Sequence, residues 1–151
     1  MPSSQCDRLP IGGRSGQPWV TLPGPGVFWL CGVLGEPGAE STPFPDPMNE
    51  LGWEDDLESP RGIEELVFAL ESTWGIVDRC LGRWTVESLG DRFIRTTEAG
   101  ARSHTRQSVL MRLLSHDAYH CGEMSQTLGI HGLPQIDLWA PSPDQSSGST
   151  G

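Results

Sequence analysis

Residues 103–129, with the sequence SHTRQSVLMRLLSHDAYHCGEMSQTLG, decide the fold that we predict for this chain. Apolar side chains recur in this stretch at intervals of three and four residues, which is the spacing of one face of an α-helix. The helix is expected to begin near Ser103 or Thr105, and Gly129 is typical of the position just beyond a carboxyl end. We therefore expect a long helix over residues 104–129. Its apolar arc consists of Val109, Leu110, Leu113, Leu114, Cys121, Met124 and Leu128.

A second long helix is predicted over residues 60–84. Ser59 suits the N-cap position, and Pro60 suits the first helical position. Apolar residues then follow at spacings of three and four, as in the buried seam of a bundle helix: Ile63, Leu66, Leu70, Trp74, Val77, Leu81 and Trp84. Residues 85–103 are expected to form a crossover loop. Two such helices need further helices to cover their apolar faces, so the pattern favours an all-α fold.

The two ends of the chain have a different composition. The first 50 residues contain 9 Pro and 8 Gly, about a third of the segment against a usual share nearer ~12%. We expect residues 1–24 to be a disordered leader and residues 27–34 to form a fragment of a helix. Residues 140–151, rich in Ser, Gly and Pro, are expected to be a disordered tail. The helical domain is therefore predicted to span residues 25–139.

The charge and the residue types exclude several classes of protein. A net charge of -10 disfavours binding to nucleic acid. All basic residues are arginine, which excludes P-loop and Schiff-base lysine chemistry. The four cysteines form no CxxC pair, so we expect free thiols in the cytoplasm. The most apolar window, residues 27–34, is shorter than the ~18 residues that a membrane helix needs, so no membrane association is expected.

His116 and His120 are the candidate metal ligands. Histidines four residues apart stand one turn above each other on a helix and can bind a single ion. Helical spacing places both, with Glu123, along the edge of the apolar arc. Two solvated or hydrogen-bonded histidines remain the alternative. Asp117 is expected to be solvated or ion-paired and Cys121 to pack as a small hydrophobe, so neither is chosen as a ligand.

The segment Ser115–Met124, SHDAYHCGEM, followed by Thr127-Leu128-Gly129 and His131-Gly132-Leu133-Pro134, resembles the last helix of DinB-like proteins. The resemblance covers residues 106–138 well, residues 59–84 fairly and the earlier chain poorly, so the best match is 59–138. It implies an up-down four-helix bundle, here with an incomplete amino-terminal half. It also implies a zinc, nickel or manganese ion held by three histidines, two of which correspond to His116 and His120. Because no histidine precedes residue 104, the third ligand has no counterpart, which leaves two alternatives: an incomplete metal site or a site that has lost its metal.

Two functions follow as expectations. The first is a DinB-like metal-dependent enzyme, a hydrolase or a thiol transferase, with an incomplete histidine triad and a small-molecule substrate that the sequence does not identify. The second is a catalytically inactive helical module that binds or builds structure. In that case the apolar seam is covered by a second copy, giving a homodimer.

Overall fold

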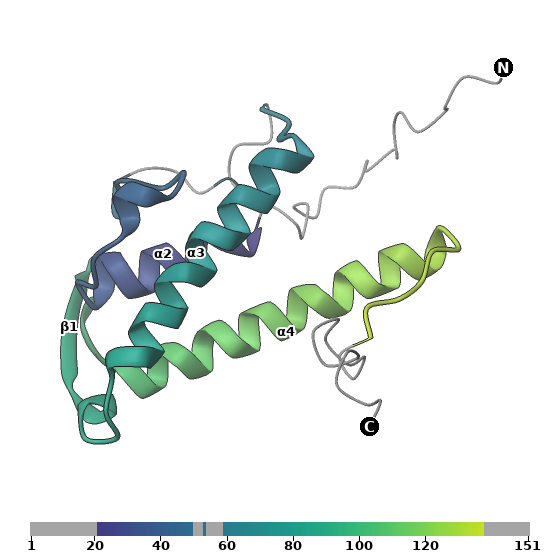
Figure 1. Ribbon diagram of the computed structural model, residues 1–151. Helices are drawn as coiled ribbons and strands as arrows, with labels where there is room; N and C mark the ends of the chain where they lie inside the picture. Colours follow the sequence, from purple (N-terminus) through teal and green to yellow (C-terminus); the bar gives the residue numbers. More distant parts are fainter. Residues whose placement is uncertain (1–20, 50–52, 54–58, 138–151) are drawn as a thin grey trace, which may run out of the picture.

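The computed structural model describes residues 21–49, 53 and 59–137. In chain order the elements are α2 (Pro23–Val27), the π-helix η1 (Phe28–Val33), the 3₁₀-helix η2 (Ala39–Ser41), α3 (Ile63–Arg83), the 3₁₀-helix η3 (Ser88–Gly90), β1 (Arg92–Thr97), β2 (Gly100–Thr105) and α4 (Arg106–Ile130). The segment α2–η1 is continuous and packs against α3. The long helices α3 and α4 lie near each other at the end that carries the hairpin and diverge away from it (Figure 1).

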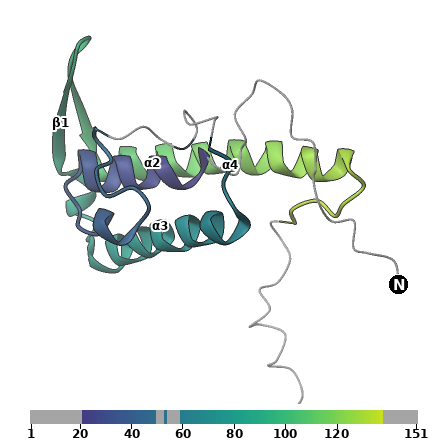
Figure 2. The same ribbon diagram turned by 90° about the horizontal axis from the view of Figure 1, so that it is seen from above.

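The expectation of an all-α, four-helix bundle is wrong. Within the described residues the chain has three α-helices and a two-stranded antiparallel sheet. The sheet is formed by part of the predicted crossover loop: Arg92 pairs with Thr105 and Thr97 with Gly100, and two residues connect the strands. Alternating aromatic, β-branched and polar residues favour a strand here, and Gly100 adopts a positive φ of 106° at the turn. Figure 2 shows this hairpin standing at one end of the molecule, beyond the helices.

The amino-terminal segment contributes more to the core than its composition predicts. Val27, Leu30 and Leu34 are buried and pack with the buried residues of α3 and α4. Pro23 opens α2, where its missing N–H has no helical partner to lose. Most of the expected leader (residues 1–20) and all of the expected tail (residues 140–151) lie outside the described residues.

The buried face of α3 differs from the predicted seam. The fully or nearly buried residues of this helix are Ala69, Thr73, Ile76 and Cys80. By contrast, Ile63 and Trp74, which the apolar period places in the core, are 81% and 64% exposed. The helix also begins at Ile63, three residues after the expected Pro60. Thus α3 presents its small residues to α2 and leaves much of its large apolar surface uncovered by the described chain.

Both ends of α4 are capped by local hydrogen bonds. At the amino end the Thr105 hydroxyl accepts from the Ser108 amide at 3.1 Å, and the Thr105 amide donates to the Ser108 hydroxyl at 2.9 Å. At the carboxyl end the Leu133 amide donates to the Leu128 carbonyl at 2.9 Å, while Gly132 adopts a φ of 70°. The left-handed residue that ends the helix is therefore Gly132, three residues beyond the Gly129 that the sequence suggested.

A buried carboxylate joins the amino-terminal segment to the two long helices. Glu36 accepts hydrogen bonds from Arg83 at 2.6 Å and from the Trp84 indole at 2.9 Å. Its other close cation is Arg106, at 3.5 Å, which also pairs with Asp91. The side chains of Glu36 and Arg106 are only 9% and 17% exposed, so the charge-assisted contact between them helps to hold the hairpin end of the molecule together, whereas Arg83 and Asp91 are more than half exposed.

Within residues 21–49, 53 and 59–137, no helix is both long enough and apolar enough to cross a membrane.

Candidate functional site

The imidazoles of His116 and His120 lie together on one side of α4. Their ring centroids are 4.5 Å apart, with the ring planes inclined at 67°. Both side chains are mostly shielded, with exposed fractions of 24% and 14%. The four-residue spacing on a regular helix produces this arrangement directly.

A carboxylate lies beside Nδ1 of each imidazole. The Nδ1 atom of His120 is 2.8 Å from Glu123 Oε2, and that of His116 is 3.2 Å from Asp117 Oδ1. In the neutral tautomer that carries its proton on Nδ1, this proton is donated to the carboxylate, and the free lone pair of the ring is on Nε2. Within the described chain, no hydrogen bond engages either Nε2 atom. This is the arrangement that fixes the tautomer of a metal-binding histidine.

The hydrogen bonds around Glu123 identify this side chain as an acceptor. The hydrogen bond from His120 lowers the pKa of the Glu123 carboxyl, and a second bond from Tyr119 acts in the same direction. That bond to Glu123 in turn raises the pKa of the Tyr119 phenol. Glu123 is therefore an ionised acceptor for both neighbours, and it orients His120 rather than offering a proton.

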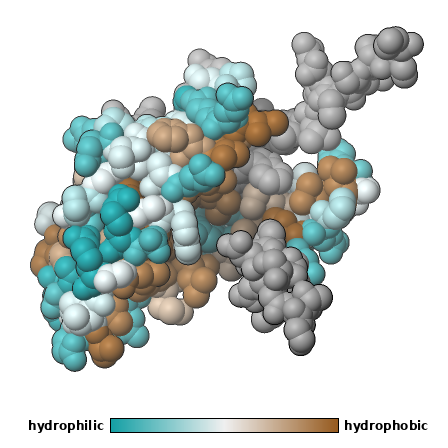
Figure 3. Space-filling model, in the orientation of Figure 1, coloured by the Kyte–Doolittle hydropathy of each residue, from teal (hydrophilic) through white to brown (hydrophobic). Residues whose placement is uncertain are grey.

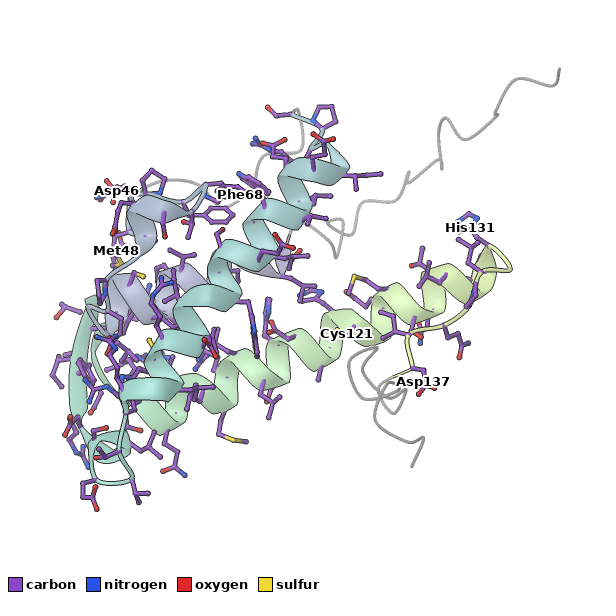
Figure 4. The ribbon with its side chains drawn as sticks, viewed as in Figure 1. Asp46, Met48, Phe68, Cys121, His131 and Asp137 are labelled. Carbon is purple, nitrogen blue, oxygen red and sulfur yellow. The ribbon has the colours of Figure 1, made fainter. Side chains whose placement is uncertain are left out.

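The histidine pair lacks a third protein ligand in the described part of the chain. No three His, Cys, Asp or Glu side chains there come close enough to hold one ion. His131 follows the carboxyl end of α4, well beyond the pair (Figure 4). His104 lies at the other end and packs on Trp29, with ring centroids 5.0 Å apart. The described residues therefore do not supply a closed three-histidine shell.

A second feature is an apolar groove between the diverging helices. It has a volume of about 480 Å³ and is lined mainly by large apolar side chains, with Asp117 and Cys121 at α4. The α3 side is formed by Leu70, Trp74, Val77 and Leu81, and the α4 side includes Leu110, Leu113 and Leu114. Apolar surface runs along α3 on the face seen in Figure 3. Figure 4 shows Cys121 on α4 away from the hairpin end, in the part of the helix that is farther from α3.

The sequence indicated the residues of this groove but assigned them to a core. Leu70, Trp74, Val77 and Leu81 belong to the predicted buried seam, and Leu114 and Cys121 to the predicted apolar arc. Their spacing shows which faces are apolar, and it does not show whether another element lies between those faces. The signal for a groove is the shortage of further apolar helices in the sequence.

Comparisons of the chain with protein-family models, with curated proteins and with solved structures found no match.

Proposed function

We propose that this chain binds a divalent metal ion of the zinc, nickel or manganese class through the Nε2 atoms of His116 and His120. The observation that carries the proposal is the pairing of each Nδ1 atom with a carboxylate. Neutral imidazoles held in this way direct Nε2 outward as a ligand, and such outer carboxylates typically raise metal affinity by about 10- to 100-fold. The resemblance of residues 106–138 to the last helix of DinB-like proteins supports the same two ligands.

The proposal concerns binding rather than turnover. A metal-dependent hydrolase or thiol transferase needs about three protein ligands and one open position for the activated water or thiol. Two imidazoles and water form a weaker site because water competes for every other position. A metal bound by this chain therefore needs a further ligand from outside the described residues before it can support catalysis.

Calorimetric titration with Zn²⁺ and Ni²⁺ tests the assignment. One ion per chain is expected, with affinity lowered at least about tenfold in both His116→Ala and His120→Ala, and about tenfold in Glu123→Gln. His131→Ala is the matched control, because this histidine lies beyond the end of α4, and it should bind like the unaltered chain. Equal affinity in His116→Ala and the unaltered chain would contradict the proposal.

The apolar groove favours a second function, self-association as a helical binding module. Trp74 lines the groove and is 64% exposed, and Leu114 on the opposite wall is 65% exposed. Contiguous exposed apolar surface of this kind is typical of an interface. Trp74→Glu and Leu114→Glu should lower the mass measured by light scattering from dimer to monomer. Ile130→Glu, at a residue that is more exposed (82%) but lies outside the groove, should not change the mass. A monomeric unaltered chain at about 100 μM rules this function out.

The proposed location is the cytoplasm, and nucleic acid is not a proposed partner. Cys31, Cys80 and Cys121 are free thiols, which suits a reducing compartment. The net charge of -10 repels a phosphate backbone over distances of about one Debye length, ~8 Å at physiological salt.

A further inference from the structure

A cluster of basic side chains surrounds Trp29 at the hairpin end of the molecule. The guanidinium carbon of Arg112 lies 4.6 Å from the centroid of the Trp29 ring, and that of Arg95 lies 5.8 Å from the same ring. Arg95 also covers Phe28, at 4.9 Å. Three separate elements, η1, β1 and α4, therefore bring these side chains together.

The hairpin adds two more basic groups to the same place. Arg102 is the cross-strand partner of Arg95, and His104 is the partner of Phe93, so all four project from one face of the sheet. His104 packs on Trp29. Burial, followed by the charges of Arg112, Arg95 and Arg102, lowers the pKa of His104, which shows that all three guanidiniums act on this imidazole.

These cations have no anionic partner in the described chain. Arg95, Arg102 and Arg112 form no ion pair or hydrogen bond there, whereas Arg83 and Arg106 are paired with Glu36. Like charges at directly opposed positions of a hairpin, such as Arg95 and Arg102, are destabilising unless a counter-charge lies between them. The Nε2 atom of His104 is also buried without a hydrogen-bond partner.

We propose that this cluster, defined by Trp29, Arg95, Arg102, His104 and Arg112, is a binding site for a small phosphate-class oxyanion. The guanidinium groups of Arg95 and Arg112 lie over the Trp29 ring, where cation–π attraction holds them. Their N–H groups make no hydrogen bond within the described chain, and the guanidinium fork matches two oxygens of a phosphate group. Arg102 and Arg112 are exposed, so the ligand can enter from solvent. The site uses none of the residues of the proposed metal site.

The rest of the molecule limits the ligand to a small one. The chain carries a net charge of -10, so a polyanion that extends beyond the cluster meets a repulsive field. A single phosphate group, either as inorganic phosphate or as a phosphomonoester, requires only the local positive charge. Arginine guanidinium groups already lie over the Phe28 and Trp29 rings, and His104 contacts Trp29 in a T-shaped arrangement, which disfavours a stacked base at this position.

Titration of the metal-free chain with inorganic phosphate and with phenyl phosphate, at low ionic strength, tests the site. Saturable binding with a Kd of about 1 mM or tighter is expected. Tighter binding of the ester would identify a phosphomonoester as the preferred form, and equal binding would identify the phosphate group alone; both support the site. Phosphate should also raise the pKa of His104, followed by NMR of its imidazole, because the anion offsets the three neighbouring arginines.

The variants Arg95→Gln and Arg112→Gln should each weaken binding about tenfold, and Arg112→Lys, which keeps the charge but loses the planar fork, by a smaller factor. Arg92→Gln is the matched control. Arg92 lies on the same strand as Arg95, but its side chain projects from the opposite face of the hairpin, so phosphate binding should change by less than about twofold. His116→Ala should bind phosphate like the unaltered chain, which separates this site from the metal proposal. The assignment is overturned if Arg92→Gln weakens phosphate binding as much as Arg95→Gln does. It is also overturned if, at about 50 mM phosphate, binding does not saturate and the pKa of His104 does not change.

Discussion

The close approach of α2 to α3 at Gly26 makes the packing of this protein directly testable. Gly26 is buried, and a Cβ atom added there would lie 2.5 Å from the Thr73 Cγ2 methyl. Carbon atoms in contact normally lie about 3.5–4.0 Å apart, so Gly26→Ala forces a shift of about 1 Å or a rotation of Thr73. Rotation would break the hydrogen bond that the Thr73 hydroxyl donates to the Pro23 carbonyl, at 3.3 Å.

The net effect of Gly26→Ala is a loss of stability. Overpacking of this kind costs about 1–3 kcal/mol, and a broken hydrogen bond adds about 1 kcal/mol. The higher helix propensity of alanine and the reduced entropy of the unfolded chain offset about 1 kcal/mol of this loss in the free energy of unfolding. We therefore expect the free energy of unfolding to fall by about 1–3 kcal/mol, as measured by urea denaturation followed by circular dichroism.

A second substitution isolates the contact. Thr73→Ser removes the Cγ2 methyl that a Cβ at position 26 would approach, and it keeps the hydroxyl that donates to the Pro23 carbonyl. In this background Gly26→Ala should be neutral or stabilising by about 0.5–1 kcal/mol, giving a coupling of about 2 kcal/mol in the double-mutant cycle. Gly122→Ala, at a helical position with no neighbour within 4 Å, should stabilise by up to about 1 kcal/mol in either background. An equal loss from Gly26→Ala in both backgrounds would refute the reasoning.

Three further predictions concern the buried polar and thiol groups. Glu36→Gln should lower the free energy of unfolding by about 2–3 kcal/mol in urea titrations, because Arg106 keeps only one of its two carboxylate partners; a loss below about 0.5 kcal/mol would contradict this. The folded state lowers the pKa of His104, so the contribution of this histidine to stability is present above about pH 6.5 and is lost as the pH falls. His104→Gln should therefore flatten the loss of stability between about pH 6.5 and 5. An unchanged pH profile of the unfolding free energy would count against this prediction. Burial, then the neighbouring Cys80, raises the pKa of the Cys31 thiol to about 11. At pH 8 its alkylation by iodoacetamide, followed by mass spectrometry, should be about 100-fold slower than for an ordinary thiol and should not level off near pH 9.

The sequence predicts the two long helices because their apolar periods are local properties of the chain. It fails for the face that α3 buries, since Ala69, Thr73 and Cys80 are not the strongly apolar residues that define a seam. These small side chains are selected by the approach of α2, whose Gly26 lies against Thr73. Such a choice depends on a partner element far away in the sequence, which a periodic pattern does not encode.

The sequence does not predict the hairpin or the basic cluster, for a related reason. Residues 93–97 show β-leaning chemistry, yet a strand needs a partner, and the partner Gly100–Thr105 has no alternating apolar pattern of its own. The pairing of Arg95 with Arg102 places two like charges opposite each other on the hairpin, and Arg95 also lies over Trp29, which belongs to a third element. By contrast, the juxtaposition of His116 and His120 arises within one helix, so their spacing alone is enough to predict it.

If both proposals hold, binding at the two sites along α4 should be coupled. Arg112 and His116 are four residues apart, so their Cα atoms lie about 6 Å apart along the helix axis. A divalent cation held by His116 and His120 would add positive charge within about one Debye length of the phosphate held by Arg112. Each ligand would then tighten the binding of the other by the same factor, because coupling between two equilibria is reciprocal.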